Sequence, residues 1–375
     1  MSDQPLVPDY GTSTLADVFG SVATSLGVDG WSGPLDLPAS RRWVILLVDG
    51  LGDANLAAAA SDAPYLAGLR EAQGRTVTSA APSTTATSVT SLGTGLTPGQ
   101  HGIVGYAFRN PVSGGYLNAL LWADGLSALD VQPRLTGFER LSRSGVALGN
   151  VSPARFQGSG LTECALRGAR FWPVADEDNH PARIRQVVDA AGAADATLTY
   201  FYERSLDHAG HSDGWRSGSW REKLRRIDRL ATRLRQELPD DTRLLVTGDH
   251  GMVDSPRERW VVAEDVPGLL DGVTLLAGEG RFRQLYAEAS DVALVAARWA
   301  RHFGDRAWVR TRDEAIDAGW FGPTDARTAQ RIGDVLVVLR DDWAVMTRNQ
   351  PKEFGLVGMH GSLTDAEMRV PLLVG

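Results

Sequence analysis

Residues 43 to 50 read WVILLVDG, an unbroken apolar run that ends in an aspartate and a glycine. A strand with one face in water alternates apolar and polar side chains, so a continuous apolar run predicts a strand covered on both faces, as in a parallel sheet. Residues 243 to 251, RLLVTGDHG, repeat this design, and VPLLVG at 370 to 375 adds another apolar run. The runs predict an α/β fold with a mostly parallel central sheet.

Helical patterns lie between these predicted strands. Apolar residues recur at helical spacing near residues 15 to 26, 184 to 192 and 220 to 238. In the last segment the apolar positions are three or four residues apart, which predicts one face packed on the core and an arginine-rich face in solvent. These apolar positions are Leu224, Ile227, Leu230, Leu234 and Leu238.

Two regions do not show the strand and helix pattern of the sheet. They span about 107–195 and 265–350, and both contain short apolar segments separated by glycine, proline and charged residues. We expect a single domain over residues 1–375 in which these regions are inserted as a cap over the strand ends. Tryptophans in both regions could line a pocket there, although a core role is more common for this residue.

Composition excludes several classes of protein and site. The chain has 375 residues, 43% of them hydrophobic, and a net charge of −8, which argues against a general nucleic-acid or anionic-membrane surface. Cys164 is the only cysteine, so an internal disulfide and a thiolate-rich metal site are excluded. The first twenty residues lack the pattern of a secretion signal, and no apolar run has membrane-spanning length, so we expect a cytoplasmic protein.

Aspartates and histidines gather where the predicted strands end. In open α/β sheets, functional sites collect at the carboxyl ends of the strands. Carboxylate and imidazole ligands without thiolate suit zinc in a catalytic setting, and they also accept manganese. The candidate ligands are Asp49, Asp207, His211, Asp249, His250 and His360.

Residues 82 to 103, PSTTATSVTSLGTGLTPGQHGI, begin with a cluster of hydroxyl side chains. One interpretation is a helix start, because serine and threonine oxygens accept hydrogen bonds from the first free N–H groups of a helix. The other is a nucleophile placed beside the candidate metal ligands. A hydroxyl is a poor nucleophile near neutral pH unless a base or a metal ion activates it.

The motifs taken together resemble the nucleotide pyrophosphatase/phosphodiesterase branch of the alkaline phosphatase superfamily. The resemblance is carried by VDG at 48 to 50, the stretch from 82 to 103, DHAGH at 207 to 211, GDHG at 248 to 251 and MHG at 359 to 361. It implies a three-layer α/β/α sandwich and a two-metal hydrolase of phosphodiester or pyrophosphate bonds. The substrates it implies are nucleotides or similar small phosphodiesters, with no nucleic-acid or membrane partner.

The resemblance also assigns roles to individual residues. It makes Thr85 the nucleophile, which forms a phospho-threonine, and a ligand of one of two Zn²⁺ ions. By the same pattern, His101 is a structural residue and His208 is not a ligand. The implied ligand sets are Asp49, Asp249 and His250 with Thr85 for one ion, and Asp207, His211 and His360 for the other.

Two positions depart from the family pattern. The family usually has an asparagine twenty-one residues beyond the nucleophile, where this chain has Tyr106. A phenol can donate one hydrogen bond to a phosphate oxygen, although a packed aromatic is an equally good interpretation. The family's TFPN is TATS here, so Ala86 offers only its backbone N–H, which could bind a phosphoryl oxygen if it opens a helix.

Three alternatives stay open at this stage. The same metal set and threonine are compatible with a phosphonate hydrolase similar to phosphonoacetate hydrolase. A phosphomonoesterase of the superfamily is a further possibility. A protein of another class, which binds metal and a phosphate ligand without turnover, is the last.

Overall fold

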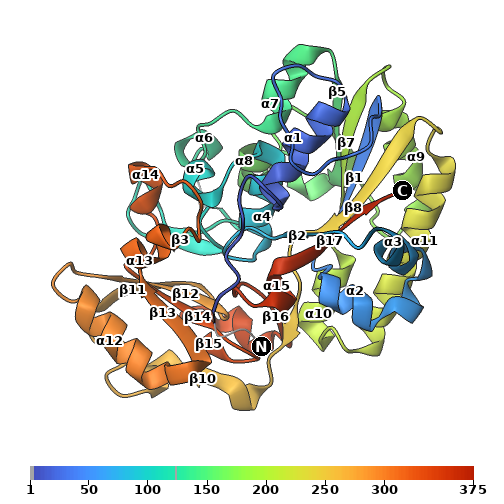
Figure 1. The fold of residues 1–375 in the computed structure, drawn as a ribbon. Coiled ribbons are helices and arrows are strands. Elements are labelled where there is room, and N and C mark those ends of the chain that lie inside the picture. Colours follow the sequence, from blue (N-terminus) through green and yellow to red (C-terminus); the bar gives the residue numbers. More distant parts are fainter. Residues whose placement is uncertain (1–3, 123–124) are drawn as a thin grey trace.

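A computed structural model describes residues 4–122 and 125–375, and within them the central feature is a seven-stranded sheet (Figure 1). The strand order is β2-β17-β8-β1-β7-β5-β6. The five strands from β8 to β6 are parallel, and β17 runs antiparallel to both of its neighbours. The strands are β1 (Arg42–Val48), β2 (Thr76–Thr78), β5 (Ala147–Pro153), β6 (Arg170–Val174), β7 (Thr197–Glu203), β8 (Thr242–Gly248) and β17 (Arg369–Val374).

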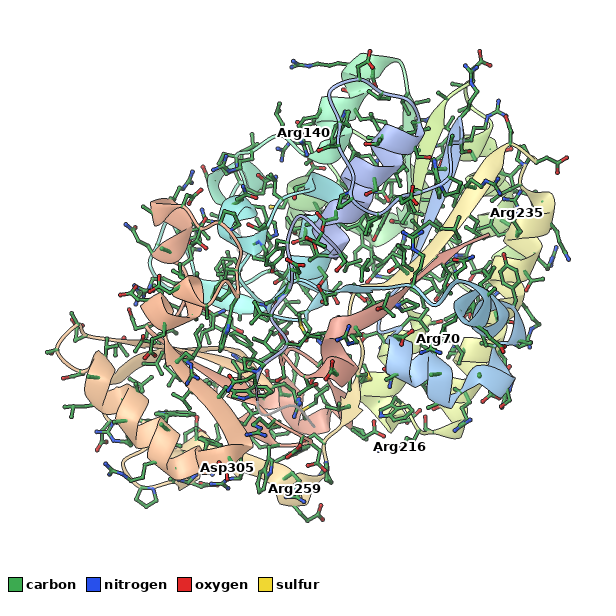
Figure 2. All side chains as sticks on the ribbon, viewed as in Figure 1. Arg70, Arg140, Arg216, Arg235, Arg259 and Asp305 are labelled. Carbon is green, nitrogen blue, oxygen red and sulfur yellow. The ribbon has the colours of Figure 1, made fainter. Side chains whose placement is uncertain are left out.

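The packing of β1 explains why residues 43 to 48 form a continuous apolar run. Val44, Leu46 and Val48 pack on one face of the sheet, while Ile45 and Leu47 pack on the other. Figure 1 shows helices on both sides of this sheet, and Figure 2 shows side chains between the layers. The helices that contribute to the first core are α2 (Asp53–Ala58), α3 (Pro64–Gln73), α9 (His180–Ala191) and α11 (Gly218–Glu237); those of the second are α1 (Leu15–Ser25), α4 (Thr85–Thr94) and α7 (Gly137–Leu141). The predicted α/β/α sandwich is confirmed.

The region expected as a cap over 265–350 forms a sheet of its own. Its strand order is β11-β12-β14-β13, all neighbours are antiparallel, and α12 (Val292–Phe303) packs on one face through Val295, Trp299 and Phe303. The other face packs against the segment that follows α4. The strands are β11 (Val273–Glu279), β12 (Phe282–Ala287), β13 (Ala307–Thr311) and β14 (Val335–Leu339).

The expectation for 107–195 is wrong in its second half. Strands β5 and β6 pair in parallel with β7 and with each other, and α9 packs on the central sheet. Their sequences, ALGNVSP and RFWPV, contain glycine, asparagine, serine or proline, so neither shows the apolar run that identified β1 and β8. The first half lies outside the sheet and holds the hairpin of β3 (Ala107–Arg109) and β4 (Tyr116–Asn118), α6 (Ala128–Val131) and α7. In the second half, α8 (Gly160–Ala165) lies between β5 and β6. Residues 123 and 124 of this region lie outside the described residues.

The other elements are short and lie between the strands and helices already described. No described helix has the length and apolar character needed to cross a bilayer. The remaining helices and strands are α5 (Pro98–His101), α10 (Ser205–Asp213), β9 (Val253–Asp254), β10 (Trp260–Val262), α13 (Arg312–Asp317), α14 (Ala326–Ala329), β15 (Ala344–Met346), β16 (Gly358–Met359) and α15 (Asp365–Met368).

Candidate active site

The register of the central sheet brings three ligand-bearing segments together. β1 lies between β7 and β8, and Val48 is level with Glu203 of β7 and with Gly248 of β8. Because all three strands are parallel, they end at the same edge of the sheet. Asp49 and Asp249 each follow directly after their strand at this edge.

The third segment is helix α10, which begins two residues after β7. It presents Asp207 and His211 on one side because they are one helical turn apart. Gly50 lets the chain turn closely past them: its φ is +75°, and a Cβ there would lie 3.1 Å from the Cα of Asp207. The Gly50 N–H also donates to Asp249 Oδ1 at 3.0 Å, so the glycine of the VDG motif joins two parts of the site.

His360 reaches the site from the C-terminal part of the chain. It follows β16, which pairs with β9 just beyond β8. A bridge between Ser83 and Gly361 then fixes this loop against the start of α4, and the Ser83 hydroxyl donates to Ser362 O at 2.6 Å. Ser83 is therefore a structural hydroxyl that connects the two loops.

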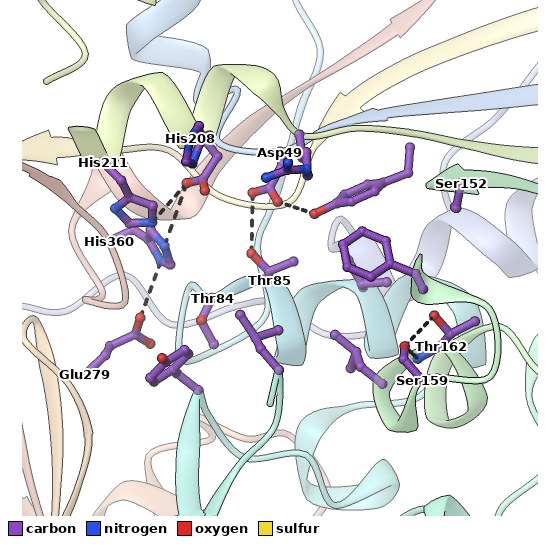
Figure 3. Close-up of a pocket in the computed structure, with 18 of the residues that line it drawn as sticks. Asp49, Thr84, Thr85, Ser152, Ser159, Thr162, His208, His211, Glu279 and His360 are labelled. Atoms are coloured by element: carbon purple, nitrogen blue, oxygen red, sulfur yellow. Dashed lines mark hydrogen bonds and ion pairs between the residues drawn. The ribbon is translucent and has the colours of Figure 1, made fainter. Parts of the chain in front are cut away.

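Thr85 is the first residue of α4, and its side chain points toward Asp49 (Figure 3). Its Oγ1 is 3.4 Å from Asp49 Oδ1 and 3.3 Å from His250 Nε2. Thr84 occupies the N-cap position, and Thr87 is fully buried. The hydroxyl cluster thus lies at a helix start, although the Thr84 side chain makes no capping hydrogen bond, and it places one hydroxyl at the aspartate and histidine cluster.

Two groups of acidic and histidine side chains are close enough to hold metal ions. Ligand atoms of Asp49, Asp249 and His250 lie within 4.8 Å of one another, as do those of Asp207, His250 and His360. His211 belongs beside the second group, because its Nε2 is 3.3 Å from Asp207 Oδ1. His360 Nε2 is 4.0 Å from the same oxygen. The structure therefore brings together all six predicted ligands, and His250 lies between the two groups.

The histidines share one orientation. Nδ1 of His211, His250 and His360 lies 2.8 to 2.9 Å from the backbone carbonyls of Gly358, Gly251 and Ser83 respectively. A carbonyl oxygen only accepts, so each Nδ1 carries a proton, and each Nε2 is the ring atom directed at the carboxylates of the site. Metal-bound histidines in proteins commonly have this arrangement.

The carboxylates at the centre are buried without enough partners. Asp207 Oδ1 and Asp249 Oδ2 are buried and make no hydrogen bond in the described structure. Burial and the nearby Asp49 carboxylate raise the pKa of Asp249 to about 8, and the same causes raise the pKa of Asp207. Burial alone would lower the pKa of His250, but Asp249 and Asp49 raise it to about 10. These residues fit divalent cations, which would neutralise the carboxylates and satisfy their oxygens.

Two other histidines of the motifs lie outside this cluster. His101 is 1% exposed and hydrogen-bonds with the Ser91 hydroxyl at 2.9 Å, while its Nδ1 accepts from the Ile103 N–H. Burial lowers its pKa to about 3. His208 is exposed, lines the pocket and belongs to neither group of candidate metal ligands. Their positions agree with the roles that the resemblance implied.

The predicted substrate-binding residues come from different elements of the chain. Ala86 is fully buried as the second residue of α4, where helix N–H groups have no partner within the helix. Tyr106 lines a pocket of about 400 Å³ that Thr85 also lines. Burial raises the pKa of Tyr106, so its phenol stays protonated.

Sequence reasoning missed two polar residues of this pocket. The Tyr202 hydroxyl donates to Asp49 Oδ2, and Glu279 Oε2 lies 3.6 Å from His360 Nδ1. Tyr202 belongs to a β-rich run in which a tyrosine carries no special signal. Glu279 comes from the second sheet, for which no motif gave guidance.

Comparison with protein families matches residues 43–363 of this chain to type I phosphodiesterase / nucleotide pyrophosphatase. No curated protein matches the chain. Among solved structures, murine ectonucleotide pyrophosphatase / phosphodiesterase 5, as an inactive variant in complex with AMP, matches with a TM-score of 0.70 and 16% identity, covering 89% of this chain and 87% of the other. The human protein of the same name matches with a TM-score of 0.69, 18% identity and the same coverage. At these identities, the structures show that the fold is shared.

Proposed function

Because the chain belongs to the type I phosphodiesterase / nucleotide pyrophosphatase family, we propose that it hydrolyses phosphodiester or pyrophosphate bonds of nucleotides or similar small phosphodiesters, with Thr85 as the nucleophile. The observation that carries this proposal is the position of Thr85 Oγ1, within 3.4 Å of both Asp49 and His250. A nucleophile needs an activating group within this kind of distance.

The six collected ligands fit two divalent ions, most simply Zn²⁺, with Mn²⁺ as the alternative. Asp49, Asp249 and His250 would hold one ion beside Thr85; Asp207, His211 and His360 would hold the other. Bound ions would supply Lewis-acid stabilisation of a threonine alkoxide and of the charge on the leaving oxygen.

The residues of this chain then divide the reaction into two displacements. Thr85 Oγ1 gives up its proton to solvent and forms a bond to phosphorus while the bond to the leaving oxygen breaks, which gives a phospho-threonine; the departing oxygen takes up a proton from solvent. A water molecule then forms the new phosphorus–oxygen bond, and Thr85 leaves and regains its proton. The free N–H groups at the start of α4, including that of Ala86, are placed to bind a phosphoryl oxygen in both steps.

A nucleotide substrate is supported by the murine neighbour, which was solved with AMP. The pocket next to Thr85 has a volume of about 400 Å³, which is enough for a small organic group. Aromatic side chains of Phe156 and Tyr202 form part of its wall, with ring centres 6.1 Å apart. We propose that this wall contacts the group that is esterified to the phosphate.

Substrate preference tests the proposed reaction. With a bis-aryl phosphodiester and an aryl phosphomonoester, we expect kcat/KM to be higher for the diester. A higher value for the monoester would contradict the diesterase assignment. If the protein hydrolyses neither ester but releases phosphate from phosphonoacetate, the phosphonate hydrolase alternative would be supported.

The variant Thr85→Ala tests the nucleophile. It removes the hydroxyl together with one methyl group and leaves the six ligands in place, so we expect it to retain about two divalent ions and to lose at least about 10³-fold in kcat, because covalent catalysis is abolished. Metal analysis and turnover measure the two effects separately. Unchanged turnover of the variant would exclude Thr85 as the nucleophile. A wild-type protein that binds metal and AMP but hydrolyses no substrate would support the alternative of a binding protein without turnover.

A further inference from the structure

A second pocket lies at the end of the second sheet that is far from the active site. Glu279, which lines the first pocket, pairs with Phe282 at one end of β12, whereas Ala287, which lines the second, is at the other end of the same strand. The pairing of β12 and β13 with β14 places Thr311 at that other end too. No described residue lines both pockets. The second pocket has a volume of about 600 Å³, and its charged lining residues are Arg109, Arg312, Asp313, Arg327, Arg331 and Asp334.

The lining of this pocket is basic, although the chain as a whole is acidic. Four arginines and two aspartates give the lining a charge of +2, while the chain has a net charge of −8. Asp334 is already engaged, because it pairs with Arg312, lies 3.9 Å from Arg109 Nη2 and accepts from the Ala287 N–H at 3.0 Å. Asp313 is exposed to solvent. The aspartates therefore leave part of the arginine charge without a partner.

Arg331 carries a buried charge that only backbone carbonyls contact. The residue is 2% exposed, and its Nη1 donates to the carbonyls of Gly102 and Val131 at 2.7 and 2.8 Å. Its Nε is buried and has no hydrogen-bond partner in the described structure. A carbonyl satisfies a donor but does not neutralise a charge, and an unpaired buried charge is costly. An anion in the pocket would reduce this cost.

Arg327 adds a second unpaired cation next to Arg331. It is exposed, and its Nη2 donates to the Asp130 carbonyl. Burial and the charge of Arg327 lower the pKa of Arg331 to about 10, so the two guanidinium groups are close enough to repel each other. Asp325, a further carboxylate that acts on Arg331, is paired with Arg134 at 3.0 Å.

Tyr286 holds a third arginine beside these two. Its hydroxyl accepts from the Arg109 N–H at 2.9 Å and donates to the Arg331 carbonyl. The Arg109 guanidinium lies 4.3 Å from the centre of the Tyr286 ring, and 34% of the Arg109 side chain is exposed. One tyrosine thus connects two of the basic residues and leaves the Arg109 side chain accessible.

We propose that this second pocket binds a phosphate dianion, either inorganic phosphate or the phosphate group of a small ester, through Arg109, Arg327 and Arg331. The charge of the lining matches that of a dianion. Guanidinium groups bind phosphate oxygens through strong, charge-assisted hydrogen bonds, which are often bidentate. The site is separate from Thr85 and its neighbouring ligands, so it goes beyond the proposed function.

The variants Arg327→Gln and Arg109→Gln/Arg327→Gln test this site. Both remove side chains that are not buried and leave Arg331 to hold its two carbonyls. Calorimetry with inorganic phosphate, on the metal-loaded protein at about pH 8, is expected to find one more binding site per chain in wild type than in the double variant. The single variant should weaken that site about tenfold or more. Arg301→Gln removes an exposed arginine of α12 outside the pocket and is the control.

Titration with AMP distinguishes the two sources of the phosphate group. Tighter binding of AMP than of inorganic phosphate at the second site would identify an ester as the ligand, and tighter binding of inorganic phosphate would identify the free ion. If neither ligand binds more weakly to the double variant than to Arg301→Gln, the inference is overturned.

Inhibition separates this site from the active site, which could also bind phosphate. We expect the inhibition constant of phosphate against a bis-aryl phosphodiester to be the same in wild type and in the double variant. A loss of binding matched by an equal loss of inhibition would place the phosphate at the active site and overturn the inference. If the wild-type protein hydrolyses no diester, the proposed function fails, and the difference in binding between wild type and variants still decides the role of the second pocket.

Discussion

At the scale of single residues, the site depends on side chains that hold the ligands as well as on the ligands. The Tyr202 hydroxyl donates to Asp49 Oδ2, while Asp49 Oδ1 lies near Thr85 and His250. One oxygen of Asp49 is thus fixed by the phenol, and the other faces the proposed metal position. Such supporting hydrogen bonds orient ligands and raise metal affinity.

The variant Tyr202→Phe is expected to weaken divalent-metal affinity by about 10-fold to 100-fold, because Asp49 loses the donor that orients it. Competition with a metallochromic chelator measures the affinity. Tyr200→Phe removes a hydroxyl from the same strand, two residues earlier, and serves as the control. Equal affinities for Tyr202→Phe and wild type would show that the phenol does not position Asp49.

At the scale of elements, the site depends on contacts between loops that are far apart in the chain. The loop before α4 and the loop after β16 meet through Ser83, whose Oγ donates to Ser362 O at 2.6 Å and accepts from Gly361 N at 3.2 Å. These bonds hold His360 next to Thr85, because the Ser83 carbonyl also accepts from His360 Nδ1.

The variant Ser83→Ala is expected to lower the free energy of unfolding by about 1–3 kcal/mol, since it leaves buried backbone groups without a partner. Urea denaturation measures this loss. The exposed Ser290→Ala variant should stay within about 0.5 kcal/mol of wild type. A Ser83→Ala protein as stable as the control would mean that the two loops are held together by other contacts.

At the scale of the whole molecule, a buried ion pair links the second sheet to the first. Arg281 of the turn after β11 forms an ion pair with Glu367 of α15 at 2.6 Å, and both side chains are 0% exposed. Glu367 also accepts from Ser362 N. The pair therefore connects the sheet that carries Glu279 to the loop that carries His360.

The variant Arg281→Met is expected to destabilise the protein by about 3–5 kcal/mol, because it leaves the Glu367 carboxylate buried without its partner. The double variant Arg281→Met/Glu367→Met should recover part of that loss, since no unpaired charge remains. Thermal or urea unfolding of both variants measures the difference. If the free energy of unfolding lost by the double variant equals the sum of the losses of Arg281→Met and Glu367→Met, the ion pair does not couple these two residues.

The sequence predicted the central part of this architecture and little of its periphery. β1 and β8 were recognisable because each contains a continuous apolar run buried on both faces of the sheet, and helices 15–26, 184–192 and 220–238 correspond to α1, α9 and α11. β5 and β6 were not recognisable as strands, because Gly149, Asn150 and Pro173 interrupt the apolar pattern.

The same distinction applies to the site. The proposed ligands could be named because each follows a recognisable strand or belongs to a motif of the family. Tyr202 and Glu279 could not, because their roles arise from contacts with residues distant in sequence, and such contacts leave no local pattern.

The metal content of the purified wild-type protein tests the central claim most directly. Six Asp and His side chains from separate segments converge on Thr85, and their unsatisfied oxygens fit two cations. After dialysis against metal-free buffer, elemental analysis is expected to find about two divalent ions, zinc or manganese, per chain. A protein that retains none, and binds none when Zn²⁺ or Mn²⁺ is added back, would contradict the account.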